Sequence, residues 1–157
     1  MRNLYVLLTV ALMACSSGTT PASNNDHSAG GKATIDLTVS GALQGTTTQL
    51  AKTDCNAPVF DGFFTTMTPV INGENYDLSI STPFKSGPVT IDLATPDNKV
   101  LLQLHNEKLG WEKTEGTTGT ITINADGVSG SADAHAMKAA GVQTFIDLKF
   151  KFYCPAS

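Results

Sequence analysis

The sequence predicts an all-β protein, an antiparallel β-sandwich or flattened barrel of about eight or nine strands joined by hairpins. Three observations lead to this prediction. From residue 146 to residue 154, apolar side chains occupy every second position, which is the period of a strand with one buried face. The pairs Asn72-Gly73 and Asp126-Gly127 each lie between two segments in which apolar and polar residues alternate. Such pairs readily adopt the positive φ of a tight hairpin turn. The links between runs are short, which favours antiparallel order.

The length and composition indicate one globular domain preceded by an export signal. The chain has 157 residues, of which 41% are hydrophobic and 15% charged, enough apolar material for one core. Arg2 precedes an apolar run over residues 4–14 that is too short to remain as a membrane span. We therefore expect residues 1–14 to be a signal peptide and the rest of the chain to be extracytoplasmic.

The signal ends in Leu12-Met13-Ala14-Cys15, which resembles the bacterial lipobox. The resemblance implies that Cys15 becomes the first mature residue and carries acyl chains such as palmitate. Multiple acyl chains anchor a protein without a transmembrane helix, since each buried methylene contributes about 0.8 kcal/mol. The alternative is ordinary cleavage near Ala14, which leaves Cys15 as a free thiol.

Residues 15–32 follow as a lipidated cysteine and a tether rich in Ser, Thr, Asn and Gly, and residues 33–157 form the single β domain. The formal net charge is −4, and removal of Arg2 with the signal makes it −5. An acidic chain of this kind argues against nucleic acid or an anionic membrane surface as the partner. The expected partners are the membrane, through the lipid anchor, and an unidentified molecule of the cell envelope.

Two cysteines remain once Cys15 is lipidated, Cys55 and Cys154. In an oxidising compartment they predict a disulfide that encloses most of the domain, whereas two buried free thiols are the alternative. A zinc site is not expected, because no histidine cluster accompanies them.

Alternation of apolar and polar residues predicts most strands in order. The first strand covers residues 33–40, and residues 46–50 are its hairpin partner. Residues 57–68 are rich in aromatics but irregular, which indicates a bulge or a loop over the core. The further expected strand segments are 70–71, 76–80, 89–93, 100–104, a short strand or loop edge at Trp111, 117–124, 128–136 and 144–154.

One packing prediction concerns the last two strands. In the run that begins at residue 128, the even positions are small, with Gly130, Ala132 and Ala134, while the final strand carries Phe150 and Phe152. Small residues opposite large ones interdigitate well, so we expect these strands to be neighbours. Between them, residues 136–140 are expected to form one helical turn before Gly141.

No segment carries a recognisable catalytic motif: His-Glu-x-x-His, Gly-x-Ser-x-Gly and phosphate-binding glycine loops are absent from the sequence. Asp133 and His135 are two apart on one strand face and could hold a metal or act as an acid–base pair. His105 and Glu107 raise the same possibility. We interpret both pairs as solvated polar residues. The threonine-rich outer faces could bind sugars, but threonine is also a good strand former, and we prefer that interpretation. The prediction is a protein without catalysis, metal or cofactor.

The stretch from residue 119 to 131 reads Gly-Thr-Ile-Thr-Ile-Asn-Ala-Asp-Gly-Val-Ser-Gly-Ser, and an alternating strand that closes on Cys154 follows it. Together with the lipobox, the tether and the Cys55–Cys154 bracket, this ending resembles small actinobacterial lipoproteins, and among them the mycobacterial secreted lipoprotein antigens. The resemblance implies an envelope-anchored β domain of adhesive or immunogenic character. It names no site residues.

The expected function is that of a cell-envelope lipoprotein whose disulfide-closed β domain acts as a non-catalytic binding or surface-interaction module. The alternative is a carrier that encloses an apolar ligand or lipid, in which the candidate ligand-facing residues are Phe60, Phe63, Phe64 and Trp111. A third possibility is an envelope enzyme that uses Asp133 and His135.

Overall fold

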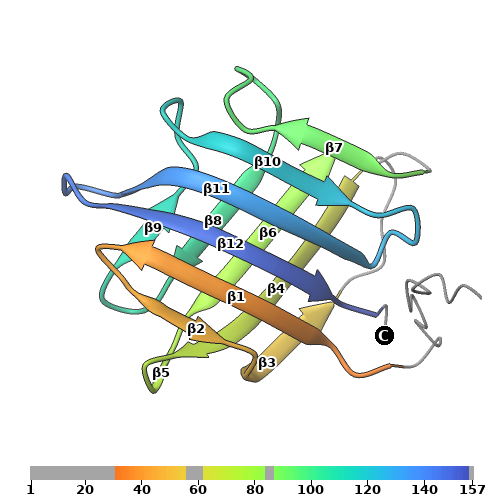
Figure 1. Cartoon of the computed structure of the whole chain (residues 1–157), viewed down its shortest axis with the longest axis horizontal. Helices are drawn as coiled ribbons and strands as arrows, with labels where there is room; N and C mark the ends of the chain where they lie inside the picture. Colours follow the sequence, from red (N-terminus) through yellow and green to blue (C-terminus); the bar gives the residue numbers. More distant parts are fainter. Residues whose placement is uncertain (1–30, 56–61, 84–86, 156–157) are drawn as a thin grey trace, which may run out of the picture.

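A computed structural model describes residues 31–55, 62–83 and 87–155, and these residues form an all-β fold without a helix (Figure 1). Cys15 and Phe60 lie outside the described residues. The strands are β1 (Thr34–Gly41), β2 (Gly45–Thr47), β3 (Leu50–Cys55), β4 (Gly62–Ile71), β5 (Glu74–Asn75), β6 (Asp77–Pro83), β7 (Val89–Asp92), β8 (Leu101–His105), β9 (Gly110–Glu112), β10 (Thr118–Ile123), β11 (Ser129–Ala139) and β12 (Phe145–Tyr153).

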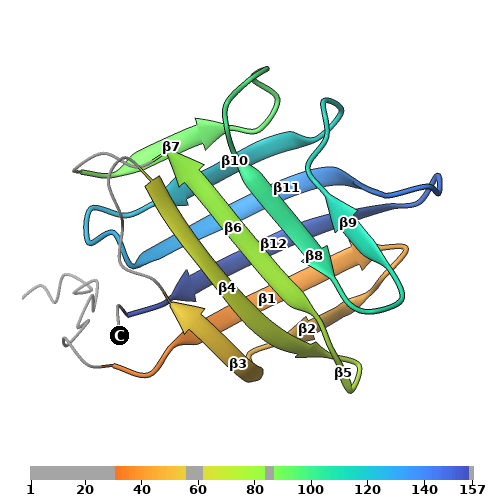
Figure 2. The same cartoon turned by 180° about the vertical axis from the view of Figure 1, so that it is seen from behind.

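Nine strands follow one another in a continuous hydrogen-bonded order, β2-β1-β12-β11-β9-β8-β6-β4-β3, and every pairing is antiparallel. The sheet curls into a half-barrel. Figures 1 and 2 show two layers whose strands cross: β1, β12, β11 and β10 in the first layer, and β8, β6, β4 and β3 in the second. The predicted fold class is therefore confirmed.

The final strand is central to the first layer, as its alternation indicates. β12 pairs with β1 over eight residue pairs on one side and with β11 on the other. Its even-numbered residues, from Ile146 to Phe152, are buried. Gly130 lies opposite Phe152 and Ala132 opposite Phe150, which confirms the predicted packing of small residues against the two phenylalanines.

The two predicted hairpin turns are present. Asn72 and Gly73 both have positive φ, at 53° and 83°, between β4 and β5. At the β10–β11 turn, Gly127 has a φ of 68°, and Asp126 Oδ1 accepts hydrogen bonds from the amides of Val128 and Ser129, both at 3.0 Å. Each turn fixes the register of the strands that it joins.

The helical turn predicted for residues 136–140 is wrong, because β11 continues to Ala139. Its register shifts between Ala134 and Met137, and Ala136 has a positive φ of 57°. The carboxylate of Asp147 on β12 accepts a hydrogen bond from the Ala136 amide at 2.9 Å, so a β-bulge replaces the helix. Before the bulge β11 pairs with β10, and after it with β9, so the bulge lies where the sheet turns from the first layer to the second.

The irregular segment expected over residues 57–68 is also wrong in its described part. Residues 62–68 belong to β4, whose side chains alternate strictly between buried and more exposed positions. Within the same strand Pro69 lies opposite Leu50, where the register between β3 and β4 shifts. A proline fits there because a bulge leaves ladder positions without a hydrogen bond.

The predicted disulfide is present. Cys55 at the end of β3 and Cys154 just after β12 are bonded, with their Cα atoms 5.4 Å apart. Cys154 is buried, and its Sγ lies 3.0 Å from the hydroxyl of Thr65 on β4, which also donates to the carbonyl of Asp54 at 3.2 Å. The bond therefore joins the second layer to the first, and a buried disulfide indicates an oxidising, extracytoplasmic location.

Candidate functional site

The aromatic residues proposed to face a ligand do not meet at one surface. Phe63 and Trp111 are 1% and 3% exposed and contribute to the core, whereas Phe64 is 45% exposed. Phe63 and Phe64 are adjacent in β4, so the period of the strand places them on opposite faces. Their positions do not support the mouth of an apolar cavity, and only Phe64 among these three is accessible.

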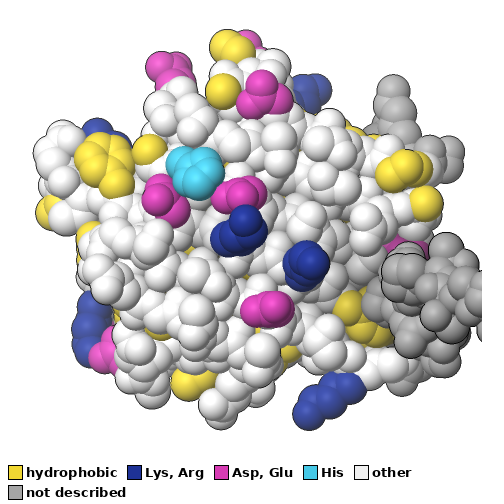
Figure 3. Space-filling model, viewed as in Figure 1, with side chains coloured by type: hydrophobic (Ala, Val, Ile, Leu, Met, Phe, Trp, Pro, Cys, Tyr) yellow, Lys and Arg dark blue, Asp and Glu magenta, His cyan; other side chains and the backbone are white. Residues whose placement is uncertain are grey.

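Asp133 and His135 do lie together on the outer face of β11, within a larger ionic cluster. The two ring nitrogens of His135 face carboxylates, with Nε2 at 3.2 Å from Asp133 Oδ1 and Nδ1 at 3.7 Å from Asp147 Oδ1. Lys149 Nζ pairs with Asp133 Oδ2 at 3.2 Å. Figure 3 shows the histidine flanked by acidic and basic side chains on this face. The charges of the cluster are thus directed at one another.

Within residues 31–55, 62–83 and 87–155, no group of three or more His, Cys, Asp or Glu side chains is arranged to hold a metal ion. In the same part of the chain there is no helix with the length and hydropathy needed to span a bilayer.

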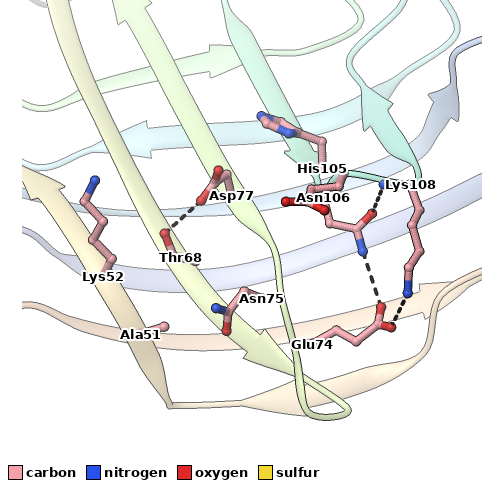
Figure 4. A pocket seen from close by; sticks show the side chains of 10 residues that line it. Ala51, Lys52, Thr68, Glu74, Asn75, Asp77, His105, Asn106 and Lys108 are labelled. Carbon is pink, nitrogen blue, oxygen red and sulfur yellow. Dashed lines mark hydrogen bonds and ion pairs between the residues drawn. The ribbon is translucent and has the colours of Figure 1, made fainter.

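A more open polar site lies on the outer face of the second layer. It is a groove of about 800 Å³ whose walls come from β3, β4, β5, β6, the end of β8 and the loop that follows β8 (Figure 4). His105 and Glu107, singled out in the sequence, both line it. A volume of this size is typical of small-molecule sites.

Four polar side chains form a row across the floor of the groove. Lys52 on β3 lies opposite Thr68 on β4, and Asp77 on β6 lies opposite His105 on β8. The hydroxyl of Thr68 donates to Asp77 Oδ1 at 2.8 Å, which links the two pairs. The row faces outward because the next residues in three of these strands, Met67, Leu78 and Leu104, are fully buried in the core.

One wall of the groove is held by Glu74. Its Oε1 pairs with Lys108 Nζ at 2.8 Å, and its Oε2 accepts from Asn106 Nδ2 and from the hydroxyl of Tyr76, both at 3.3 Å. The hydrogen bond and the charge of Lys108 lower the pKa of Glu74 and, reciprocally, raise the pKa of Lys108. Burial, reinforced by the Glu74 carboxylate, raises the pKa of Tyr76.

The loop after β8 is fixed by its own hydrogen bonds. Asn106 Oδ1 accepts from the amides of Lys108 and Leu109 at 2.9 and 3.0 Å, while Asn106 N donates to the carbonyl of Leu109 at 2.9 Å. The wall that carries Glu74 and Lys108 is therefore preorganised.

By contrast, no described side chain pairs with Lys52 or His105, and Asp77 Oδ2 accepts no hydrogen bond from the described part of the chain. These groups are available to a ligand.

The sequence indicates that Lys52, Thr68 and Asp77 are polar, and the alternation around Leu78 already places Asp77 outward. The groove was missed because β3 and β4 were not recognised as regular strands that pair with each other. Comparison of the chain with protein-family models, with curated proteins and with solved structures gave no match.

Proposed function

We propose that this chain is a lipid-anchored protein of a bacterial cell envelope, and that its β domain is a non-catalytic binding module. The observation that carries the binding role is the groove on the second layer, where Lys52, Asp77 and His105 project from paired strands without satisfying one another. Charged groups held on strands at a preformed surface are suited to recognising a polar molecule.

The lipobox supports the anchor, because acylation of Cys15 would hold the mature N-terminus at the membrane. The disulfide supports an extracytoplasmic place of work. A binding surface is favoured over a carrier because Phe63 and Trp111 lie in the core.

Metabolic labelling with an alkyne analogue of palmitate tests the anchor. The full chain expressed in a bacterial host should take up the label and partition into the detergent phase, whereas the Cys15→Ser variant should do neither. An inhibitor of lipoprotein signal peptidase should cause the unprocessed chain to accumulate. If the native chain and Cys15→Ser are labelled equally, the lipoprotein assignment is wrong.

A sedimentation assay tests the binding role. The full chain in detergent is mixed with purified cell-wall material, and the co-sedimenting fraction is compared with that of a Lys52→Met/Asp77→Asn double variant. The matched control, Lys151→Met/Asp36→Asn, removes one cation and one anion from the outer face of the first layer, where these residues occupy opposite positions in the register of β12 and β1. Loss of sedimentation in the groove variant alone supports a binding module that uses the groove. Equal sedimentation of both variants contradicts it.

A further inference from the structure

The charges around the groove define what kind of molecule it can take. Two cations, Lys52 and Lys108, and three carboxylates, Glu74, Asp77 and Glu107, line it. Because Glu74 and Lys108 neutralise each other, the charges left for a ligand are one ammonium and two carboxylates. This balance disfavours polyanions, and it favours a molecule with at least one cationic group.

Asp77 and Thr68 are poised to accept hydrogen bonds from an ammonium group. The Thr68 hydroxyl proton is directed at Asp77 Oδ1, so its oxygen lone pairs remain as acceptors. Asp77 Oδ2 is a second acceptor and carries negative charge. A ligand ammonium between these two oxygens would meet two acceptors on adjacent strands. A neutral donor would gain less, because hydrogen bonds between charged groups are the stronger ones.

Lys52, the cation of the groove that has no ion-pair partner in the described part of the chain, lies on the opposite side of Thr68 from Asp77. Lys52 and Asp77 are on strands separated by β4, so their backbones are two strand spacings apart, or roughly 10 Å. An α-amino acid places its ammonium and carboxylate about 3 Å apart. With a hydrogen bond of about 2.8 Å at each end, such a zwitterion bridges roughly 9 Å. Lys52 and Asp77 project from the same face of the sheet, and the long, flexible stem of Lys52 lets its ammonium reach that separation from the Asp77 carboxylate. A zwitterion can therefore place its ammonium on Asp77 and its carboxylate on Lys52.

We propose that the groove binds the zwitterionic α-amino-acid group of its ligand, with the ammonium on Asp77 and Thr68 and the carboxylate on Lys52. This inference rests on the proposed binding function and names its ligand chemistry. The groove, at about 800 Å³, is far larger than one amino acid. It thus has room for a molecule that carries the α-amino-acid group at the end of a side chain, such as a lysine acylated at Nε. A free amino acid presents the same chemistry.

Titration of the ¹⁵N-labelled full chain in detergent, followed by amide chemical shifts, tests the proposal with four probes. Glycine has both charges, N-acetylglycine lacks the ammonium, glycinamide lacks the carboxylate, and triglycine has both charges too far apart. We expect glycine to shift amides around Thr68 and Asp77 and to bind about fivefold more tightly than each of the other three, the ratio that corresponds to about 1 kcal/mol.

Two variants test which side chain binds which charge of the ligand. Asp77→Asn should abolish the preference for glycine over N-acetylglycine and leave the preference over glycinamide. Lys52→Met should do the reverse. The matched control is Lys151→Met on the first layer, which should change neither preference. A structural disturbance of the groove would weaken all four probes together, so the selective loss of one preference separates recognition from misfolding.

The source of the zwitterion is distinguished by a fifth probe, a lysine acylated at Nε by a tripeptide. Tighter binding than glycine identifies the end of a larger molecule, whereas equal binding identifies a free amino acid. If glycine binds no more tightly than its blocked forms, or shifts amides only outside the groove, the zwitterion proposal is overturned. That result leaves the palmitate labelling and the sedimentation assay unaffected, so the proposed function can stand without this ligand class.

Discussion

Gly130 on β11 lies opposite Phe152 on β12, and a Cβ atom at Gly130 would lie 2.8 Å from Cε1 of the phenylalanine ring. The same atom would overlap the backbone carbonyl oxygen of Thr122 on β10. Because a backbone atom lies on one side and a buried ring on the other, an added methyl group would have no space to move into. Glycine at this position therefore allows three adjacent strands to approach closely around a large aromatic side chain.

The first prediction is that Gly130→Ala destabilises the domain. The added methyl group must displace Phe152 or separate β10 from β11, which we expect to cost about 1–3 kcal/mol of unfolding free energy. Chemical denaturation followed by tryptophan fluorescence measures the change. Gly116→Ala is the matched control, since nothing lies within 4 Å of a Cβ at that exposed turn position. Comparable stability of the two variants would contradict the steric role of Gly130.

The second prediction concerns the bulge in β11. Ala136 has a φ of 57°, a conformation that costs an L-residue about 1–2 kcal/mol and glycine almost nothing. Ala136→Gly should therefore raise the unfolding free energy by up to about 1 kcal/mol, after the larger unfolded-state entropy of glycine is subtracted. Ala134→Gly, two residues earlier and fully buried, should lower it by about 1–2 kcal/mol through a lost methyl contact and greater chain entropy. Thermal unfolding of both variants shows whether the signs are opposite.

The third prediction concerns the disulfide. The bond closes a loop with a sequence separation of 99, so its loss should lower the unfolding free energy by about 2–5 kcal/mol. A Cys55→Ala/Cys154→Ala variant, compared with the native chain by urea denaturation, gives the value. Reduction of the native chain should raise its intact mass by the two hydrogens of one disulfide. Because Cys154 is buried against Thr65 and Cys55 is partly buried, that reduction should be slower than reduction in denaturant.

The fourth prediction concerns the ion pair on the wall of the groove. Since Lys108 lowers the pKa of Glu74, Lys108→Met should return that pKa toward its ordinary value, as carboxyl carbon shifts in a pH titration would show. Lys151→Met on the opposite layer is the control and should leave the Glu74 titration unchanged. Added salt should diminish the difference, because both side chains are solvent accessible.

The same pair should make stability depend weakly on pH. The folded-state pKa of Glu74 is lowered, so its contribution is complete above the unfolded-state pKa and is lost as the pH falls through the folded-state value. The pKa of Lys108 is raised, so its contribution is lost as the pH rises through its folded-state value. The stability difference between native and Lys108→Met should thus be largest between roughly pH 5 and pH 10. A difference that grows below this window would contradict the assignment.

The alternation of apolar and polar residues predicted those strands that have one buried face and one exposed face. Ile146, Leu148, Phe150 and Phe152 were placed inward because period 2 leaves only two faces, and the pairing of small with large residues then identified β11 as a neighbour of β12. The hairpin turn at Asn72-Gly73 could also be predicted from the sequence, because it depends only on the two residues that form it.

Features that depend on distant residues were not predictable in this way. The carboxylate that holds the bulge at Ala136 comes from Asp147, eleven residues away, so local propensity alone suggested a helical turn. Pro58 and Gly62 made residues 57–68 look irregular. Residues 62–68 are nonetheless a regular part of β4, because they pair with β3 and β6, and that pairing is not visible in local composition. The groove depends on that same pairing, which brings Lys52 beside Thr68.

The position of the disulfide has a mechanical consequence. Thr34, the first residue of β1, pairs with Tyr153, and the next residue in the chain, Cys154, is bonded to Cys55 on β3 (Figure 1). Tension applied at Thr34 acts at the end of β1 that lies beside Cys154, so it loads the first residue pairs of the antiparallel β1–β12 ladder before the later ones. It then passes through a covalent bond into the strand that carries Lys52. A ligand held in the groove would thus be connected to the start of β1 through one strand pair and one covalent bond.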